Sequence, residues 1–448
     1  MISTVYIAKN VYGGDGLGRL GDGRVVFVPG AWAGEQVRAE IVEEKKSFVK
    51  ARLVEIVEPS PERVKEEGSV PGMVYASLSY KGECAAKEQQ LREFFERARI
   101  SVGMGDSGWV SASCRGGAGT SAGMELNYRN KVVYHIGRIG GEALLPRRNK
   151  DASSDSRRDR SVASPFVIGY RTEPSHEIVD IASDPLARPE INAKLPEIRR
   201  QILMLLTTGP EVVRRETEKK ANVTIRWTKK TGVKWWLGKA PQGLVLKETT
   251  LGRDFEVPAD GFYQVNPEVG EELVRAVVAE YQKGAAVAPD ILDLYCGVGV
   301  FGLCCASAAA EDGSRYGGRL TGIESGRAAI DFARRNAEAI FRCPPQPSTS
   351  TSSFRFYAEE VGRNLKRISV TPKTTVVIDP PRGGLEPGVA RWLAQSKAPR
   401  IFYVSCDPAT LMRDLKEISK GYKVESVRWF NMFPRTARFE TLVILSKA

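Results

Sequence analysis

The sequence predicts an α/β protein: a C-terminal domain built on a parallel sheet, an N-terminal β-barrel of the OB type, and a mixed α+β region between them. Residues 1–58 contain short strand-like segments separated by glycine turns, which is typical of a small barrel. From about residue 256, strand-like and helix-like segments alternate, which indicates parallel strands joined by helices. A chain of 448 residues is long enough for two or three such domains.

The N-terminal segment, residues 1–58, has the features of a nucleic-acid-binding barrel. Residues 35–41 and 51–57 alternate apolar and polar side chains, and the turn at 45–50 is basic. OB-type barrels often hold nucleic acid with basic and aromatic side chains. The alternative is a barrel that serves only as a docking module.

The composition excludes some classes of function and favours others. The net charge of +12 favours a polyanionic partner. Hydrophobic residues make up 42% and charged residues 27%, as expected for a soluble globular protein. Only two histidines are present, which argues against a Ser-His-Asp hydrolase or a histidine-rich metal site.

The sequence also bears on the compartment. No run reaches the roughly 18 consecutive apolar residues of a membrane helix. Residues 1–10 lack the layout of a secretory signal. Seven scattered cysteines predict no disulfide framework, so we expect a reducing, cytoplasmic location. We further expect a monomer without membrane contact.

The region between the barrel and the α/β domain, residues 59–255, is expected to be an α+β RNA-binding domain. It mixes a helix near 85–99 with several strand-like runs. A low-complexity basic insert near 147–163 predicts a mobile loop. This insert either attracts phosphates or has no function.

The C-terminal domain, residues 256–448, is predicted to form one sheet. Its strands are expected at residues 291–294, 320–324, 375–378, 401–405, 424–430 and 440–445.

The first strand of this domain leads into a candidate cofactor site. Residues 290–302, Asp-Ile-Leu-Asp-Leu-Tyr-Cys-Gly-Val-Gly-Val-Phe-Gly, form a strand, a glycine turn and the start of a helix. Gly297 allows the backbone to approach a ligand at the carboxyl end of the strand. The next strand ends in Glu324, where a carboxylate can accept both ribose hydroxyls. A packing turn is the alternative, but the two features together favour an adenosyl cofactor.

A second motif follows the third strand. Residues 376–384 read Val-Val-Ile-Asp-Pro-Pro-Arg-Gly-Gly, so the strand stops at two prolines that fix a rigid loop. Asp379 is thereby expected to point into the cleft at the sheet edge. The alternative is a stiff connector with a capping aspartate.

Cys406 is the candidate nucleophile. It follows the strand at 401–405 and precedes a helix that Asp407 can cap and Pro408 can begin. The helix dipole predicts a lowered pKa for this thiol. The alternative, a buried structural cysteine, is the interpretation that we favour for Cys304 and Cys305, which lie in an apolar helix.

Glu440 is the candidate general base. It begins the last predicted strand, directly after the run Phe-Pro-Arg-Thr-Ala-Arg-Phe at 433–439. A glutamate at a strand end is usually solvated, so this assignment depends on the other candidate residues.

Together these segments resemble the RNA uracil-C5 methyltransferase family. The resemblance extends over essentially the whole chain, and the N-terminal barrel resembles a TRAM domain. The most selective segments are Asp-Pro-Pro-Arg and Ser-Cys-Asp-Pro. The segments that carry the resemblance lie at residues 128–131, 262–266, 293–299, 379–382, 405–408 and 433–440.

The resemblance implies a function and roles for the candidate residues. It implies that S-adenosylmethionine is the methyl donor and that a uridine in RNA is methylated at C5. Cys406 would be the nucleophile and Glu440 the proton acceptor. It also implies contacts of the cofactor with Gln264, Tyr295, Glu324 and Asp379, beside the turn at Gly297. Cytosine-C5 enzymes carry a further cysteine in the Asp-Pro-Pro segment, and its absence here favours uracil.

One departure from the family concerns iron. Many relatives hold a four-iron cluster through cysteines that follow the TRAM domain. In this chain Met73 aligns with one ligand position and Asp184 with the fourth, and Cys84 and Cys114 do not restore the spacing. We therefore expect no iron–sulfur cluster and no other metal.

The RNA target remains open at this point. The TRAM-like barrel favours 23S ribosomal RNA, and the T-loop of tRNA is the nearest alternative. An RNA-binding protein without catalysis and a small-molecule methyltransferase are alternatives of other classes. Cys406 with Glu440 argues against the first, and the basic barrel argues against the second.

Overall fold

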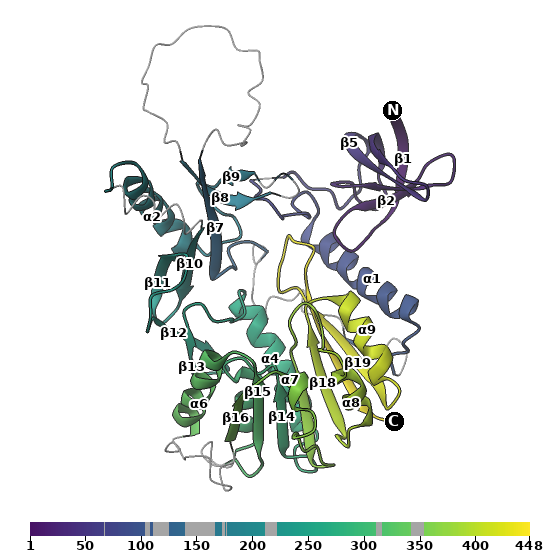
Figure 1. The fold of residues 1–448 in the computed structure, drawn as a ribbon. Coiled ribbons are helices and arrows are strands. Elements are labelled where there is room, and N and C mark those ends of the chain that lie inside the picture. The colour runs from purple at the N-terminus through teal and green to yellow at the C-terminus, as the bar shows by residue number, and fades with distance from the viewer. Residues whose placement is uncertain are drawn as a thin grey trace. The chain divides into compact units, whose positions relative to one another are not determined.

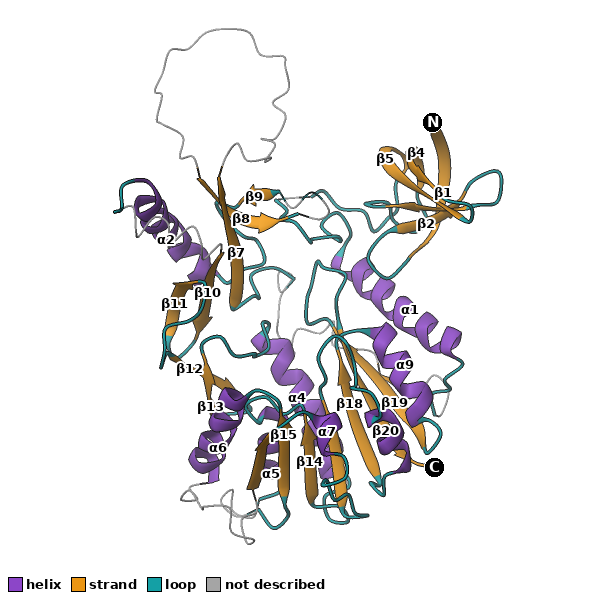
Figure 2. Cartoon of the chain, viewed as in Figure 1, coloured by secondary structure: helices purple, strands orange, loops and turns teal. Residues whose placement is uncertain are grey.

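A computed structural model describes residues 1–66, 68–103, 108–110, 125–138, 166–172, 175, 177–210, 222–310, 316–341 and 354–448. The basic insert near 147–163 lies outside these residues, as do Cys114 and His176. The chain forms two compact units (Figures 1 and 2). The first comprises residues 1–67, 73–125 and 245–448, and the second comprises residues 68–72 and 126–244. The domain boundaries expected from the sequence stay predictions.

The N-terminal strands close into a five-stranded barrel with the order β1-β2-β3-β5-β4. Its strands are β1 Ile2–Asn10, β2 Gly16–Arg19, β3 Val25–Val28, β4 Gln36–Glu44 and β5 Phe48–Glu58. Small apolar side chains fill its centre, among them Val5, Ile7 and Val26. At Gly18 a side chain would collide with Val5 and with the carbonyl of Tyr6, so only glycine fits there. The predicted OB-type barrel is confirmed.

The second unit is an antiparallel sheet with the order β11-β10-β7-β8-β9, packed against helix α2. Its elements are β7 Lys131–Arg138, β8 Phe166–Arg171, β9 Ile178–Asp180, α2 Pro189–Thr207, β10 Asn222–Thr228 and β11 Gly232–Leu237. Ile191, Leu195 and Ile198 lie on the buried face of α2. This arrangement agrees with the expected α+β character of the region.

The C-terminal sheet has eight strands in the order β16-β15-β14-β17-β18-β20-β19-β6. Strands β14 to β18 pair in parallel, whereas β20 runs antiparallel to both β18 and β19. The strands are β6 Trp109–Val110, β14 Asp290–Leu294, β15 Leu320–Glu324, β16 Phe354–Ala358, β17 Thr374–Ile378, β18 Arg400–Ser405, β19 Tyr422–Phe430 and β20 Glu440–Lys447. The predicted α/β class is confirmed; edge strands β6 and β16 were not predicted.

Helices cover both faces of this sheet. They are α1 Tyr80–Ala98, α4 Pro267–Gln282, α5 Val300–Ala308, α6 Arg327–Phe341, α7 Val361–Asn364, α8 Val389–Gln395 and α9 Pro408–Ile418. A separate hairpin of β12 Val245–Thr250 and β13 Arg253–Pro258 precedes α4. Because side chains alternate along a strand, Ile291 faces the core that α4, α5 and α6 cover. Leu292 and Leu294 face the core that α1, α8 and α9 cover.

Helix α1 begins earlier than the sequence predicted. The expected helix covered residues 85–99, but the structure extends it to Tyr80 because the Ser79 hydroxyl accepts the backbone N–H of Gly82 at 2.9 Å. The extra turn carries Glu83, a buried carboxylate.

Candidate active site

The seven site residues predicted from the sequence line one pocket of about 990 Å³ at the carboxyl end of the parallel strands. These residues are Gln264, Tyr295, Gly297, Glu324, Asp379, Cys406 and Glu440. They come from six separate segments of the chain. The structure therefore brings the whole predicted set together, while the role of each residue stays a prediction.

The turn after β14 forms one wall of the pocket. Tyr295 and Gly297 both have positive φ angles, 62° and 54°, which turn the backbone sharply from the strand toward α5. Asp293 supports this turn from the buried side by accepting the N–H of Gly302 at 2.9 Å. Burial raises the pKa of Asp293 to about 7. The N–H of Cys296 also donates to the carbonyl of Ile323 at 3.1 Å, so the turn is held both within its own segment and from β15.

Glu324 occupies the end of β15, next to this turn. Its carboxylate accepts the backbone N–H of Gly326 at 2.7 Å and the hydroxyl of Ser325 at 3.0 Å. These contacts set the orientation of a half-buried carboxylate on the pocket wall. Such a group can accept the two hydroxyls of a ribose.

Gln264 reaches the pocket from the segment before α4. Asn266 caps α4 through Val269 at 3.4 Å, and its amide donates to the carbonyl of Met432 at 3.3 Å. This second contact ties the Gln264 segment to the loop between β19 and β20. Phe262, 71% exposed, also lines the pocket.

Two buried oxygens on the pocket wall have no hydrogen-bond partner within the described residues, Gln264 Oε1 and Glu440 Oε2. Leaving a buried acceptor unpaired costs about 1–3 kcal/mol. Ligand N–H groups at these positions would remove that cost. With the Glu324 carboxylate and the open turn at Gly297, the pocket has the polar groups that an amino acid joined to a nucleoside requires. The residues present therefore fit S-adenosylmethionine.

Cys406 follows β18 and precedes α9. The Asp407 side chain caps the helix by accepting the N–H groups of Ala409 at 3.0 Å and Thr410 at 3.1 Å. The sequence predicted a lowered pKa for this thiol, and that prediction is wrong. Burial and the carboxylates of Glu440 and Asp379 raise the pKa of Cys406 to about 12. These effects outweigh the helix dipole, so the free enzyme holds a neutral thiol.

Three acidic groups therefore share the catalytic part of the pocket. Burial raises the pKa of Asp379 to about 7. Burial and the charge of Asp379 raise the pKa of Glu440 well above its ordinary range. The guanidinium of Arg382 acts in the opposite direction on both Glu440 and Cys406. A pocket of this kind favours neutral acids and holds protons that a reaction can move.

Arg438 is a pocket residue that the sequence reasoning missed. It forms an ion pair with Asp407 at 3.3 Å, and it donates to the hydroxyl of Tyr12 at 3.1 Å. Tyr12 belongs to the turn between β1 and β2, and its ring packs edge-on against Phe439. Arg438 lies within residues 433–440, one of the segments that carry the resemblance to the family, whereas no sequence pattern indicated a role for Tyr12.

Other residues singled out in the sequence lie outside the pocket. Cys304 and Cys305 are buried in α5, as expected of packing residues. Asp184 accepts the hydroxyls of Tyr134 at 3.0 Å and Tyr170 at 2.7 Å inside the second unit. Within the described ranges, no group of three or more His, Cys, Asp or Glu side chains is arranged to hold a metal.

Within the part of the chain that the structure describes, no helix combines the length and the apolar character needed to cross a membrane.

Comparison with known proteins gives consistent matches. A family model described as tRNA (Uracil-5-)-methyltransferase matches residues 245–448, and a TRAM domain model matches residues 4–54. A protein of Thermotoga maritima described as an uncharacterized RNA methyltransferase is 29% identical over 481 residues. The alignment covers 100% of this chain and 99% of that protein. A Streptomyces avermitilis protein with the same description is 29% identical over 99% of this chain and 98% of its own length.

Among solved structures, the chain is similar to the Pyrococcus abyssi tRNA (uracil-54, C5)-methyltransferase in complex with S-adenosyl-L-homocysteine. The TM-score is 0.65 at 21% sequence identity, over 98% of this chain and 100% of that chain. This likeness confirms the fold.

Proposed function

We propose that the chain methylates C5 of a specific uridine in RNA, with S-adenosylmethionine as methyl donor, Cys406 as nucleophile and Glu440 as base. The match of residues 245–448 to the tRNA (Uracil-5-)-methyltransferase model and the full-length similarity to proteins described as RNA methyltransferases support this proposal. The observation that carries the proposal is the single pocket in which Cys406, Glu440 and Asp379 lie beside the turn at Gly297.

The chemistry explains why a thiol and a base are needed. Uracil C5 is too weak a nucleophile to take a methyl group unaided. Addition of the Cys406 sulfur to C6 converts the ring to an enolate whose C5 can attack a methyl group. Glu440 in its ionised form then removes the proton from C5, and the electron pair left behind breaks the C6–S bond. The expelled thiolate of Cys406 takes up a proton and becomes a thiol again. The uridine must leave its stack to reach the pocket, and the exposed ring of Phe262 is placed to contact it.

The raised pKa of Cys406 adds a condition to this scheme. A thiol with a pKa of about 12 is almost wholly protonated at neutral pH, so it loses its proton only as it attacks. Arg382 is the cation whose charge lowers the pKa of this thiol, and we assign it to stabilising the forming thiolate. Asp379, with a pKa of about 7, is partly ionised at neutral pH, and we assign it to accepting the thiol proton as the bond from sulfur to C6 forms.

The remaining pocket residues would hold the methyl donor. S-adenosylmethionine supplies an electrophilic methyl group when bound. Glu324 would accept hydrogen bonds from its ribose, Tyr295 and Gly297 would line its binding turn, and Gln264 with Asp379 would bind its polar groups. No metal takes part in the proposed reaction, and we propose that the protein carries no iron–sulfur cluster; quantifying iron and sulfide in purified protein tests this.

For the substrate we propose 23S ribosomal RNA. The TRAM domain at residues 4–54 and the net charge of +12 support an RNA partner. A tRNA T-loop uridine is the alternative, favoured by the description of the family and by the activity named for the Pyrococcus abyssi protein. We further propose that the enzyme acts as a monomer in the cytoplasm, which light scattering and cell fractionation test.

The decisive experiment compares RNA from cells with and without the gene. Mass spectrometry of purified 23S rRNA and tRNA should show the loss of a 5-methyluridine from rRNA. Loss from tRNA alone would select the alternative substrate. If neither pool loses the modified base, the proposed activity is wrong.

A further inference from the structure

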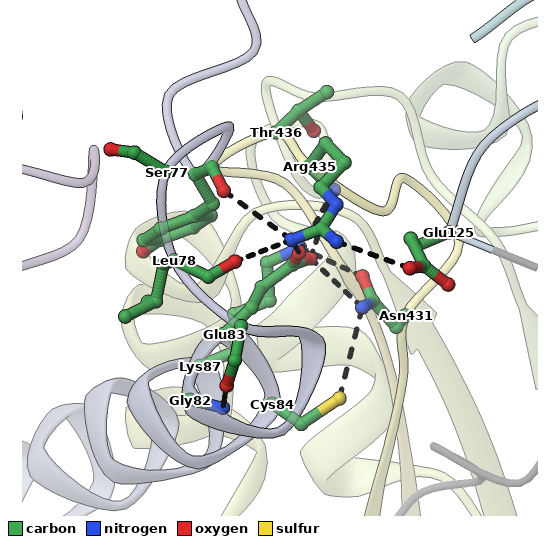
Figure 3. Close-up of polar contacts among 12 residues, drawn as sticks. Ser77, Leu78, Gly82, Glu83, Cys84, Lys87, Glu125, Asn431, Arg435 and Thr436 are labelled. Atoms are coloured by element: carbon green, nitrogen blue, oxygen red, sulfur yellow. Dashed lines mark hydrogen bonds and ion pairs between the residues drawn. The ribbon is translucent and has the colours of Figure 1, made fainter. Parts of the chain in front are cut away.

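A cluster of buried charges lies outside the pocket, between α1 and the loop that joins β19 to β20 (Figure 3). Glu83 and Lys87 on α1 are both fully buried, and their side chains form an ion pair at 2.7 Å. Asn431 and Arg435 of the loop are also buried. The loop continues from this cluster into Arg438 and Glu440, both of which line the pocket.

Glu83 is the centre of the cluster. Its carboxylate accepts from three donors: Lys87 Nζ at 2.7 Å, Asn431 Nδ2 at 2.9 Å, and the backbone N–H of Arg435, which lies 3.0 and 3.1 Å from its two oxygens. Lys87 in turn donates to Asn431 Oδ1 at 2.7 Å and to the carbonyl of Phe433 at 3.3 Å. One carboxylate therefore binds the loop directly at Asn431 and Arg435.

The other side of the loop is held by the segment before α1. The Arg435 guanidinium donates to the carbonyl of Leu78 at 2.6 Å and of Tyr75 at 3.4 Å, and it pairs with Glu125 at 3.2 Å. The N–H of Tyr75 donates to the carbonyl of Arg435 at 3.1 Å. Arg435 itself has a φ of 66°, a conformation that a non-glycine residue keeps only when its surroundings impose it.

The cluster is better explained by conformational control than by stability. A buried ion pair is weak evidence for stability, because apolar side chains of similar volume often serve as well. What apolar side chains cannot do is hold backbone N–H and carbonyl groups at defined positions. The contacts of Glu83 and Lys87 are made to those groups, at Arg435 and Phe433.

We infer that Glu83 is a positioning residue for the reaction: through Asn431 and Arg435 it fixes the path of the loop that places Phe433 and Glu440 in the pocket. The inference rests on the proposed function, since it assigns to Glu83 the alignment of the base. Glu83 does not itself line the pocket. Proton removal from C5 demands close alignment, so a small shift of the loop would slow this step more than the preceding ones.

The test is Glu83→Gln, which keeps the shape of the side chain but leaves the buried Lys87 without its counter-charge. We expect multiple-turnover methylation of the RNA to fall at least about tenfold, because misplacement by about 1 Å costs that much or more. S-adenosylmethionine affinity should stay within about twofold. A methylated, covalent enzyme–RNA adduct should accumulate, because addition and methyl transfer precede the step that needs Glu440.

A double variant separates positioning from folding. Glu83→Gln with Lys87→Met removes both charges of the pair and leaves Arg435, which also lies 3.9 Å from Glu83, paired with Glu125. Its melting temperature should therefore return toward that of the wild type. Its turnover should stay low and its adduct should persist. If the double variant regains full turnover along with its stability, the inference is wrong. If Glu83→Gln alone does not fold, the double variant provides the test in its place.

Glu35→Gln is the matched control. Glu35 is as buried as Glu83, accepts the backbone N–H groups of Trp32 and Ser60, and pairs with Arg63 at 2.5 Å. It lies in the barrel, and neither Glu35 nor these partners line the pocket. This variant should lose stability without accumulating the adduct. The inference would be overturned if Glu83→Gln turned over at the wild-type rate. It would also be overturned if Glu83→Gln and Glu35→Gln lost turnover equally and neither accumulated the adduct. A wild-type enzyme that forms no 5-methyluridine would instead refute the proposed function on which it rests.

Discussion

The two parts of the pocket are built differently. In the cofactor part, short-range contacts support the turn at Gly297 and the Glu324 carboxylate: Asp293 accepts the N–H of Gly302, and Glu324 accepts the N–H of Gly326, two residues away. Longer-range contacts are backbone bonds to neighbouring strands and the N–H of Glu386, which donates to the Tyr295 hydroxyl at 3.4 Å. In the catalytic part, support comes from distant segments: Tyr12 binds Arg438, and Glu83 binds Arg435 across 352 positions. A binding surface can thus be encoded in short motifs, whereas alignment of the reacting groups depends on the assembled fold.

The largest effect is expected from Cys406→Ala. If the catalytic part performs the chemistry and the cofactor part only binds, turnover should fall at least about 10⁴-fold, as for loss of other essential nucleophiles. Binding of S-adenosylmethionine, measured by calorimetry, should change by less than about twofold. A comparable loss of cofactor binding would show that the two parts are not separable.

Glu324→Ala should have the converse effect. Loss of two hydrogen bonds from the ribose to a carboxylate should raise KM for S-adenosylmethionine about 10- to 100-fold. The kcat should change little, because these contacts are the same in the ground state and the transition state. Steady-state kinetics at saturating RNA measures the split, and a fall in kcat with unchanged KM would contradict it. Glu338→Ala, on α6 and outside the residues that line the pocket, is the control.

The pH midpoint for alkylation of Cys406 should depend on the charged side chains near its thiol. Carboxylates raise the pKa of this thiol and Arg382 lowers it. Asp379→Asn should therefore move the pH midpoint of alkylation down by about one unit, and Arg382→Gln should move it up by a smaller amount. Mass spectrometry can follow alkylation at Cys406 specifically, since Cys304 and Cys305 are buried. A downward shift in both variants would mean that the assignment of these charges is wrong.

Tyr12→Phe should give the smallest effect. It removes the hydrogen bond that the barrel makes to the half-exposed Arg438, so we expect about a threefold loss of kcat with RNA. Tyr6→Phe, at a position 62% exposed on the same barrel, should change nothing measurable. Equal effects of the two substitutions would show that Tyr12 does not act through Arg438.

Local patterns in the sequence predicted the fold class and most residues of the pocket, whereas Gln264 and Tyr295 came from the resemblance to the family. A strand followed by a glycine turn identified the Gly297 wall, and Asp407 with Pro408 marked the start of α9 after Cys406. Predictions failed where remote charges decide the outcome. The pKa of Cys406 is raised partly by Glu440 and Asp379, which come from other strands, and no local pattern shows their proximity. The contacts of Tyr12 and Glu83 escaped prediction for the same reason.

The central claim is that Cys406 forms a covalent bond to the RNA and that Glu440 is needed to resolve it. Glu440→Gln enzyme should be incubated with substrate RNA and S-adenosylmethionine, then separated under denaturing conditions and digested for mass spectrometry. We predict a 5-methylated uridine attached to the peptide that contains Cys406, and no such species when Cys406→Ala is combined with Glu440→Gln. Free 5-methyluridine formed by the Glu440→Gln enzyme at the wild-type rate, with no adduct, would contradict the account.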